Sequence, residues 1–396
     1  MYINRAIKQQ VLELKKGFPV VVITGPRQAG KTTFLQHNFP KNKYFNLEDP
    51  ITLQIIKEDP VTFFRDNPKD IIIDEVQRFP ELLSHIQVLV DKRQEMGSIL
   101  LSGSQNLLLS EKVSQTLAGR AAYQTVLPLS FSELEKAKLL GKNRFSQILK
   151  GGYPSIYTRD VSPKTYFKQY IATYAERDIR QIRNISELSQ FQKFMILLAG
   201  RVGQLLNVSS LATDTGISPN TAEDWISILE ASYVVYRLQP FFKNVGKRLI
   251  KSPKLYFYDT GLLTTLLNIH DKEMLQSHYL IGNIFENFIV SEFVKGTNNN
   301  QVSAQLYFFR DSHGNEVDLI IDIGDSQIPV EIKSSATYNS EFAKGLNNWN
   351  EMVKGKTGYV IYGGSEIITI MNTVVLPWTD LGKVLKSWEG EMCVRF

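Results

Sequence analysis

A nine-residue loop near the N-terminus restricts the fold more than any other feature of the sequence. The segment VVVIT (residues 20–24) is rich in β-branched residues and predicts a short buried strand, and GPRQAGKTT (residues 25–33) follows it directly. The loop fits the pattern G-x-x-x-x-G-K-[ST], in which backbone N–H groups and the N-terminus of the next helix bind phosphate. Strand, loop and expected helix in this order predict an α/β nucleotide-binding domain.

Each position of this phosphate-binding loop has an expected role with ATP. Gly25 and Gly30 allow the backbone to curve so that its N–H groups point at the phosphates. Lys31 is expected to reach the β- and γ-phosphates, and the Thr32 hydroxyl to bind Mg²⁺. Arg27 is a candidate phosphate contact or an ordinary surface arginine. The predicted ATP-binding residues are Gly25, Pro26, Arg27, Gln28, Ala29, Gly30, Lys31, Thr32 and Thr33.

A second apolar run, DIIIDEVQR (residues 70–78), predicts a buried strand that ends in two acids. Asp74 is expected to hold the Mg²⁺ shell, and Glu75 to orient and polarise the attacking water. The alternative is that both acids only cap a surface strand. Together with the loop, this strand predicts ATP hydrolysis with ATP and Mg²⁺ as cofactors.

Three further segments complete the expected sheet: residues 43–49, 98–106 and 121–129. A strand between the phosphate-binding loop and the acidic strand, followed by a strand with a polar end, is the arrangement of AAA+-type ATPases. Ser104, or alternatively Gln105, is then the expected sensor of the γ-phosphate.

Arg120 follows a small-residue turn, LAGRAA, near the edge of this expected domain. An arginine there is a candidate to stabilise transition-state charge, in its own site or in that of a neighbouring subunit. The alternative is an ordinary surface arginine. If Arg120 acts in the site of a neighbouring subunit, the protein is expected to form a homo-oligomeric ring, such as a hexamer.

The chain has a basic middle although its net charge is only +5. Residues 141–260 carry 17 Lys and Arg against 9 Asp and Glu, which suggests a segment that binds a polyanion such as DNA; a merely solvated surface is the alternative. The single cysteine, Cys393, excludes an internal disulfide. No apolar run approaches the ~20 residues that span a bilayer, and the N-terminus lacks a signal-peptide pattern, so we expect a cytoplasmic protein without membrane contact.

Residues 207–240 resemble a helix-turn-helix with Gly216 in the turn and Ser218 as the cap of the second helix. YVVYRLQPF and KLYFYD resemble the two strands of a wing, so a winged-helix domain is expected. The second helix carries Glu223 and Asp224 and no basic residue, and a role in protein packing alone is the alternative. The better polyanion contact is the basic loop, with Lys243, Lys247, Arg248, Lys251 and Lys254.

The C-terminal part combines an amphipathic helix carrying Glu286, a hairpin-like pair of apolar runs carrying Asp318, and the strand IPVEIK. Alternation places Glu331 and Lys333 on the same face of that strand. Carboxylates gathered around a lysine form a divalent-metal site in which the metal activates water against a phosphodiester. The alternatives are a degenerate nuclease-like module and an ordinary charge pair.

The motifs GPRQAGKTT, IIIDEVQR, LLSGSQN, LAGRA, GGYP, ERDI, KLYFYDTGLL, NEVDLII and VEIKSS, with G-x-x-F-E at Gly282–Glu286, cover nearly the whole chain. In these motifs the chain resembles the prokaryotic AAA-type ATPases with a C-terminal DUF4143 domain. The resemblance implies a AAA core, a winged helix and a C-terminal PD-(D/E)xK restriction-endonuclease-like fold. It also implies catalytic Asp318, Glu331 and Lys333, with Glu286 as the acid of the helix. Val317 departs from the pattern, where a proline often precedes the first acid.

The expected fold is α/β with four parts: a P-loop AAA+-type ATPase domain (1–140), a helical connector (141–200), a winged-helix domain (201–262) and a nuclease-like domain (263–396). The predicted function is an ATP-hydrolysing DNA-processing enzyme with Mg-dependent cleavage. The alternative is a nucleotide-switched regulator or defence sensor with a non-catalytic nuclease-like domain, and a small-molecule kinase is a third option.

Overall fold

The computed structural model describes residues 1–103, 116–174, 188–241, 251–300, 304–324, 326–353 and 358–384. The chain packs into two compact units. The first consists of Met1–Leu129 with the short segments Tyr153–Thr158 and Ala231–Val234, and the second of Ser130–Gly152, Arg159–Glu230 and Val235–Phe396.

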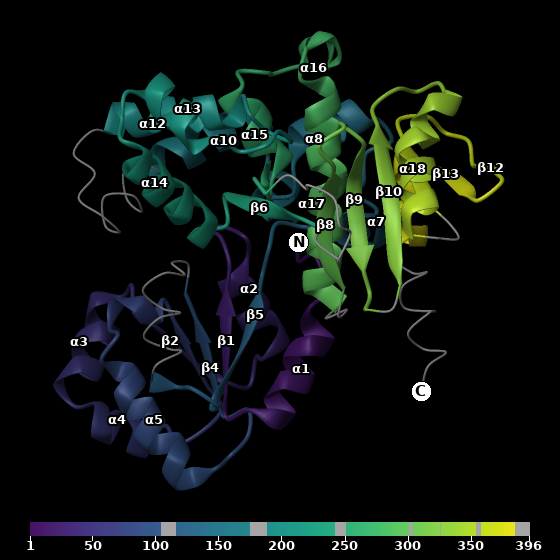
Figure 1. The fold of residues 1–396 in the computed structure, drawn as a ribbon. Helices are drawn as coiled ribbons and strands as arrows, with labels where there is room; N and C mark the ends of the chain where they lie inside the picture. The colour runs from purple at the N-terminus through teal and green to yellow at the C-terminus, as the bar shows by residue number, and fades with distance from the viewer. Residues whose placement is uncertain are drawn as a thin grey trace. The chain divides into compact units, whose positions relative to one another are not determined.

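The first unit is built on a five-stranded parallel sheet with the strand order β2-β3-β4-β1-β5 (Figure 1). Its strands are β1 (Val20–Thr24), β2 (Lys43–Asn46), β3 (Ile71–Asp74), β4 (Ile99–Ser102) and β5 (Ala121–Thr125). Its helices are α1 (Lys8–Gly17), α2 (Lys31–Asn38), α3 (Pro50–Glu58), α4 (Pro60–Asp66), α5 (Leu82–Arg93) and α9 (Pro154–Thr158), with the 3-10 turn Val76–Arg78. All five predicted strands are confirmed.

Both faces of this parallel sheet are covered, which explains why its strands are continuous apolar runs. Alternate residues of β1 point to opposite faces: Val20 and Val22 join one core with α3, α4 and α5, and Val21 and Ile23 join the other with α1 and α2. The sheet therefore holds the end of β1, where the phosphate-binding loop begins, between two apolar layers.

The second unit starts with helices: α7 (Phe131–Lys136), α8 (Arg144–Lys150), α10 (Pro163–Tyr174), α12 (Leu188–Ala199), α13 (Val208–Thr215) and α14 (Pro219–Ala231). The helices α13 and α14 lie where the sequence predicts a helix-turn-helix. Asn207 caps α13, Gly216 adopts φ 82°, and the Ser218 hydroxyl accepts the N–H of Thr221. Trp225 of α14 packs on aromatic rings of α12.

The rest of the second unit is an eight-stranded mixed sheet with the order β12-β13-β11-β10-β9-β8-β6-β7 (Figure 1). Its strands are β6 (Val235–Pro240), β7 (Lys254–Phe257), β8 (Gln305–Arg310), β9 (Glu316–Asp322), β10 (Gln327–Lys333), β11 (Gly358–Tyr362), β12 (Ile368–Ile370) and β13 (Thr373–Pro377). Its helices are α15 (Thr260–Leu266), α16 (Lys272–Ser277), α17 (Ile281–Asn300) and α18 (Lys344–Val353), with 3-10 turns at Ser340–Ala343 and Trp378–Asp380.

The two expected wing strands pair antiparallel as β6 and β7, but they do not end a separate domain. Pro240 of β6 pairs with Phe308 of β8, so the hairpin extends the C-terminal sheet. The predicted boundary between residues 262 and 263 therefore does not follow the packing.

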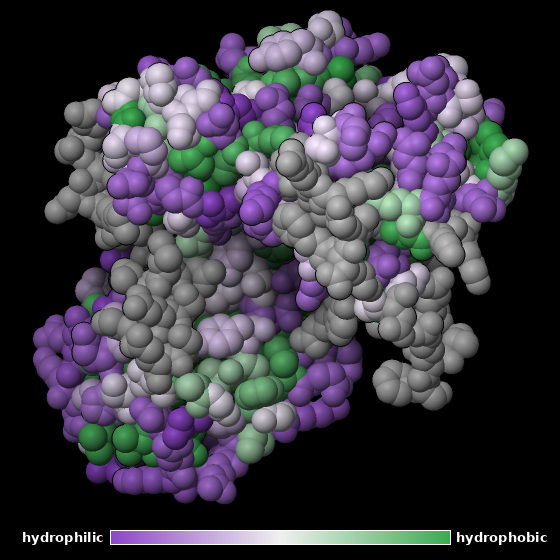
Figure 2. All heavy atoms as spheres, in the orientation of Figure 1, coloured by the Kyte–Doolittle hydropathy of each residue, from purple (hydrophilic) through white to green (hydrophobic). Residues whose placement is uncertain are grey.

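Hydrophilic and hydrophobic residues are mixed on the face of the molecule that Figure 2 shows. Hydrophilic residues cover much of this visible surface, with smaller hydrophobic patches between them. In the described part of the chain, every helix is too short or too polar to cross a membrane.

Candidate functional site

The phosphate-binding loop has a backbone that glycine makes possible. Gly25 adopts φ 138° and Gly30 φ 94°, values that other residues rarely adopt. A Cβ at Gly25 would lie 2.2 Å from the carbonyl oxygen of Val126 on the neighbouring segment. Gln28 also adopts a left-handed conformation, with φ 59°. The loop then enters α2 at Lys31, which places the positive end of the helix next to the loop.

The loop holds its own lysine where an anion is expected. Lys31 is buried, and its ammonium donates to the carbonyl oxygens of Gly25 at 2.9 Å and Pro26 at 2.8 Å. Bound phosphate would compete with these neutral acceptors for a charged donor, and charge-assisted bonds are the stronger. This geometry fits the predicted role of Lys31.

Asp74, at the end of β3, is the centre of a hydrogen-bond network. It accepts the Thr32 hydroxyl at 2.6 Å, the Tyr44 hydroxyl at 2.7 Å and the N–H of Glu75 at 3.1 Å, and also the Ser102 hydroxyl. Thr32 and Asp74, the pair predicted for the Mg²⁺ shell, thus lie in contact and fit that ion.

The sequence does not predict Tyr44 and Ser102 as partners of Asp74. Burial and the adjacent Asp74 raise the pKa of the Tyr44 hydroxyl. A polar residue that ends a buried strand is the only signal for Ser102.

Glu75 follows Asp74 with φ 57°, a left-handed conformation that is uncommon for a residue with a side chain. Its carboxylate accepts the Gln77 amide. Its role as the residue that orients water stays a prediction. The predicted sensors Ser104 and Gln105 lie outside the described residues.

Arg120 lies at the opposite end of the strands from the phosphate-binding loop. It directly precedes β5, whose first residue pairs with Val20, whereas the loop follows Thr24. Four residue steps along a strand span roughly 13 Å. The Arg120 guanidinium binds Asp91 of α5, with one N–O distance of 2.9 Å. A role for Arg120 in the site of its own subunit is therefore not supported, and a role in a neighbour's site stays a prediction.

Two further residues fix the phosphate-binding loop from distant parts of the chain. The buried Arg5 donates to the carbonyl oxygens of Ala29 at 2.8 Å and Leu127 at 2.5 Å. The Tyr233 hydroxyl lies 3.0 Å from the hydroxyl of Thr24, at the end of β1. Neither contact has a signal in the sequence, because each depends on the packing of the first unit.

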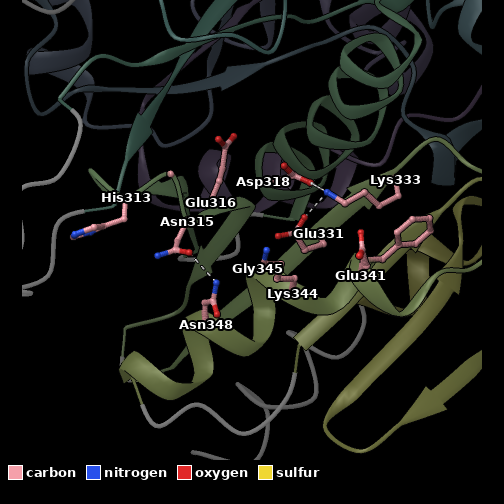
Figure 3. A pocket seen from close by; sticks show the side chains of 12 residues that line it. His313, Asn315, Glu316, Asp318, Glu331, Lys333, Glu341, Lys344, Gly345 and Asn348 are labelled. Carbon is pink, nitrogen blue, oxygen red and sulfur yellow. Dashed lines mark hydrogen bonds and ion pairs between the residues drawn. The ribbon is translucent and has the colours of Figure 1, made fainter.

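The second unit contains a cavity of about 410 Å³ beside the carboxyl-terminal residues of β10 (Figure 3). It is lined by the turn between β8 and β9, by β9 and β10, which carry the predicted acids, by the 3-10 turn Ser340–Ala343 and by the start of α18. The lining residues are His313, Gly314, Asn315, Glu316, Asp318, Glu331, Lys333, Glu341, Phe342, Lys344, Gly345 and Asn348. The predicted catalytic residues Asp318, Glu331 and Lys333 are thus brought together.

Lys333 bridges the two acids. Its ammonium lies 3.2 Å from Asp318 and 2.6 Å from Glu331, and the N–H of Ile332 donates to Asp318 at 2.8 Å. Burial and the adjacent Asp318 raise the pKa of Glu331 well above its usual range. Burial also raises the pKa of Asp318, but Lys333 and Lys254 outweigh it and the net shift is downward. The cavity therefore presents two carboxyl groups held together by one lysine.

Glu286, the predicted helix acid, faces two other residues. It accepts Lys254 at 2.9 Å and the Tyr256 hydroxyl at 2.5 Å, and it is not part of the cavity wall. Within the described ranges, no three His, Cys, Asp or Glu side chains are grouped to hold a metal. Asp318 and Glu331 alone fit one Mg²⁺, which commonly takes one or two carboxylates and keeps several waters.

Lys254 corrects the prediction for the basic loop. It is buried in ion pairs with Glu286 and Glu316, so it is not a surface contact for a polyanion. Lys251 is exposed, and Lys243, Lys247 and Arg248 lie outside the described residues.

The chain is similar to known protein families and to known proteins. Successive regions match models of an AAA domain (residues 17–135), of a domain of unknown function, DUF8612 (142–273), and of another domain of unknown function, DUF4143 (281–381). An uncharacterised protein of Mycobacterium tuberculosis is 31% identical over 324 residues, which cover 81% of this chain and 71% of that protein. An uncharacterised protein of Methanocaldococcus jannaschii is 26% identical over 321 residues, covering 73% and 69%.

Among solved structures, the Walker-type ATPase of Pyrococcus abyssi is similar with 14% identity and a TM-score of 0.44. The match covers 67% of this chain and 96% of that one, and at this score it carries no argument about function.

A parallel sheet with a phosphate-binding loop on β1, over the region that matches the AAA model, defines an AAA-family ATPase that uses ATP and Mg²⁺. The chain belongs to the family of these ATPases in which DUF8612 and DUF4143 domains follow the AAA domain. The predicted AAA core and C-terminal DUF4143 domain are confirmed.

Proposed function

We propose that this ATPase is a DNA-processing enzyme that couples ATP hydrolysis to DNA binding or remodelling and to metal-dependent cleavage of a phosphodiester. The observation that carries the proposal is the convergence of Asp318, Glu331 and Lys333 on one cavity from two adjacent strands. The helix α17, the strands β8 to β10, the helix α18 and the strand β11 follow one another as expected for a nuclease-like core.

In this cavity Asp318 and Glu331 would hold the metal ion. The bound ion would supply a water of lowered pKa and a positive charge for the phosphate. Lys333 is placed between both acids and would stabilise negative charge on the phosphodiester. The Lys333 side chain is 34% exposed and lines the cavity.

The helix-turn-helix is better suited to DNA than its sequence suggests. Arg237 of β6 binds Glu223 at 2.5 Å and Glu230 at 3.0 Å, both on α14. These ion pairs reduce the negative charge that the helix would present to phosphates. The excess of Lys and Arg in residues 141–260 adds a general attraction to DNA.

We further propose that the ATPase acts as a homo-oligomeric ring. Arg120 lies far from its own phosphate-binding loop, so a catalytic role requires the site of another copy. Asp91 holds its guanidinium at the surface of the first unit.

The test is to separate the two activities in the full-length protein. A Glu331→Ala variant is expected to lose Mg²⁺- or Mn²⁺-dependent cleavage over a panel of duplex, single-stranded, forked and four-way DNA. Its ATPase rate and the stimulation of ATPase by DNA should remain. Persistent cleavage by this variant would rule out the proposed site.

A second candidate function is a nucleotide-switched regulator or defence sensor, in which the nuclease-like region only binds a partner. The observation that favours it is that Lys254 pairs with Glu286, the predicted acid of the helix, which therefore does not join Asp318 and Glu331 in the cavity wall. Under this function, Lys333→Ala would leave activity unchanged, and the protein would show no DNA affinity even at low salt.

A further inference from the structure

A buried lysine of the second unit has no role in the proposed function so far. Lys254, on β7, is 3% exposed, and its ammonium lies 2.9 Å from Glu286 and 2.5 Å from Glu316. An ammonium taken out of water costs several kcal/mol unless carboxylates and hydrogen bonds replace the water. The two glutamates supply that replacement.

One of these two partners, Glu316, belongs to the cavity wall, and Glu286 does not. Asp318 lies two residues beyond Glu316 along β9, on the same face of the strand. Glu316 also pairs with Arg310 at 3.2 Å. Glu286 also accepts a hydrogen bond from the Tyr256 hydroxyl.

Four acids of this region are therefore divided between two lysines. Lys254 takes Glu286 and Glu316, and Lys333 takes Asp318 and Glu331.

We propose that Lys254 is a positioning residue of the cavity: a fixed internal cation that binds Glu286 and Glu316 and leaves Asp318 and Glu331 as the site of a single divalent cation. The inference rests on the proposed function, because it concerns the same metal site. A metal ion at Glu286 would have to displace the Lys254 ammonium, whose side chain is 3% exposed, whereas the Lys333 side chain beside Asp318 and Glu331 is 34% exposed.

Lys254 and the four acids come from different family regions of the chain. Lys254 lies in the DUF8612 match, whereas all four acids lie in the DUF4143 match. The hairpin of β6 and β7 delivers it, because β6 pairs with β8 of the DUF4143 region. The metal site of one region is thus completed by a residue of the region before it.

Mn²⁺ binding to the full-length protein without nucleotide tests this inference, with electron paramagnetic resonance as the readout. The wild type is expected to bind one Mn²⁺ in the cavity. The Asp74→Asn variant, which lacks the metal ligand of the ATP site, should still bind this ion. Glu331→Gln should lower the affinity of the cavity for Mn²⁺ about tenfold or more. Glu286→Gln should leave its affinity within about twofold, because a glutamine oxygen still accepts from Lys254 and Tyr256.

The Lys254→Met variant tests whether removal of the ammonium creates a new metal site. It frees Glu286 and Glu316, so the variant is expected to bind a second Mn²⁺, and Glu286→Gln in that background should remove it. Thermal unfolding in EDTA verifies that each variant is folded. If Lys254→Met does not fold, the comparison of Glu286→Gln with Glu331→Gln still decides.

The outcomes separate the two proposals. Equal loss of Mn²⁺ in Glu286→Gln and Glu331→Gln would overturn the role of Lys254 and leave the proposed metal site standing. A wild type without any Mn²⁺ that Glu331→Gln removes would overturn the metal site itself, and the role of Lys254 with it.

Discussion

The phosphate-binding loop and the cavity of the DUF4143 region are built in different ways. The loop is nine consecutive residues, and its lysine is held by carbonyl oxygens only five and six residues away in the chain. The cavity is lined by residues from 313 to 348, and its charges are balanced by Lys254, far outside that stretch. A site made of backbone is specified locally, whereas a site made of paired charges depends on the whole sheet.

The largest expected effect is confined to the loop. Lys31→Ala should lower the ATPase rate about 100-fold or more, because the one mobile cation that reaches the β- and γ-phosphates is lost. Mn²⁺ binding at Asp318 and Glu331 should be unchanged, since those acids are balanced by Lys333. Parallel ATPase and Mn²⁺ titrations check this, and a loss of both would show that the two sites are not independent.

A second substitution concerns only the cavity. A Cβ at Gly345, in the first turn of α18, would lie 2.0 Å from the Glu331 carboxylate and 2.3 Å from the carbonyl oxygen of Glu316. Gly345→Ala should therefore destabilise the second unit by about 1–3 kcal/mol and weaken Mn²⁺ binding. Chemical denaturation and Mn²⁺ titration measure the two effects.

Gly282→Ala is the matched control for this prediction. Gly282 is also the second residue of a helix, α17, but a Cβ there meets nothing within 4 Å. The change should stabilise the protein by up to about 1 kcal/mol, as alanine is the better helix former. Equal behaviour of the two variants would contradict the close packing of α18 on Glu331.

The difference between a site specified by neighbouring residues and one specified by the whole sheet also explains which features the sequence predicts. The strands of the first unit follow from apolar runs, and the loop from its glycines, because these signals are local. The pairing of Pro240 with Phe308 joins distant segments, so the wing hairpin is indistinguishable in sequence from an independent one.

Lys254 gives the sharpest case. It follows a run of lysines, and only its burial between Glu286 and Glu316 distinguishes it from a DNA contact. Tyr44 was missed for a similar reason, since its partner Asp74 lies on the adjacent strand.

Tyr44→Phe should produce a moderate effect in the loop region. It removes one donor to Asp74, while Thr32, Ser102 and the N–H of Glu75 still donate. One lost hydrogen bond to a charged group costs about 1.5 kcal/mol, which predicts a roughly tenfold rise in the KM for Mg-ATP. Steady-state kinetics over a range of Mg²⁺ concentration would detect it. An unchanged KM together with a lower kcat would assign Tyr44 to catalysis instead of metal binding.

The smallest effect is expected for Arg120→Ala in isolated subunits. Its partner Asp91 is exposed, and exposed ion pairs contribute little to stability. The unfolding temperature should hardly change, and ATPase at protein concentrations too low for assembly should be unchanged. At concentrations that allow assembly, the rate should fall if Arg120 completes a neighbour's site.

Asp91→Ala is the control for this last variant, because it breaks the same ion pair and keeps the arginine. Mixing Arg120→Ala subunits with Lys31→Ala subunits then separates the cases. An arginine that acts in trans restores part of the activity in the mixture, since an intact loop can meet an intact Arg120. Equal ATPase rates for Arg120→Ala and the wild type at every concentration would show that the guanidinium only binds Asp91.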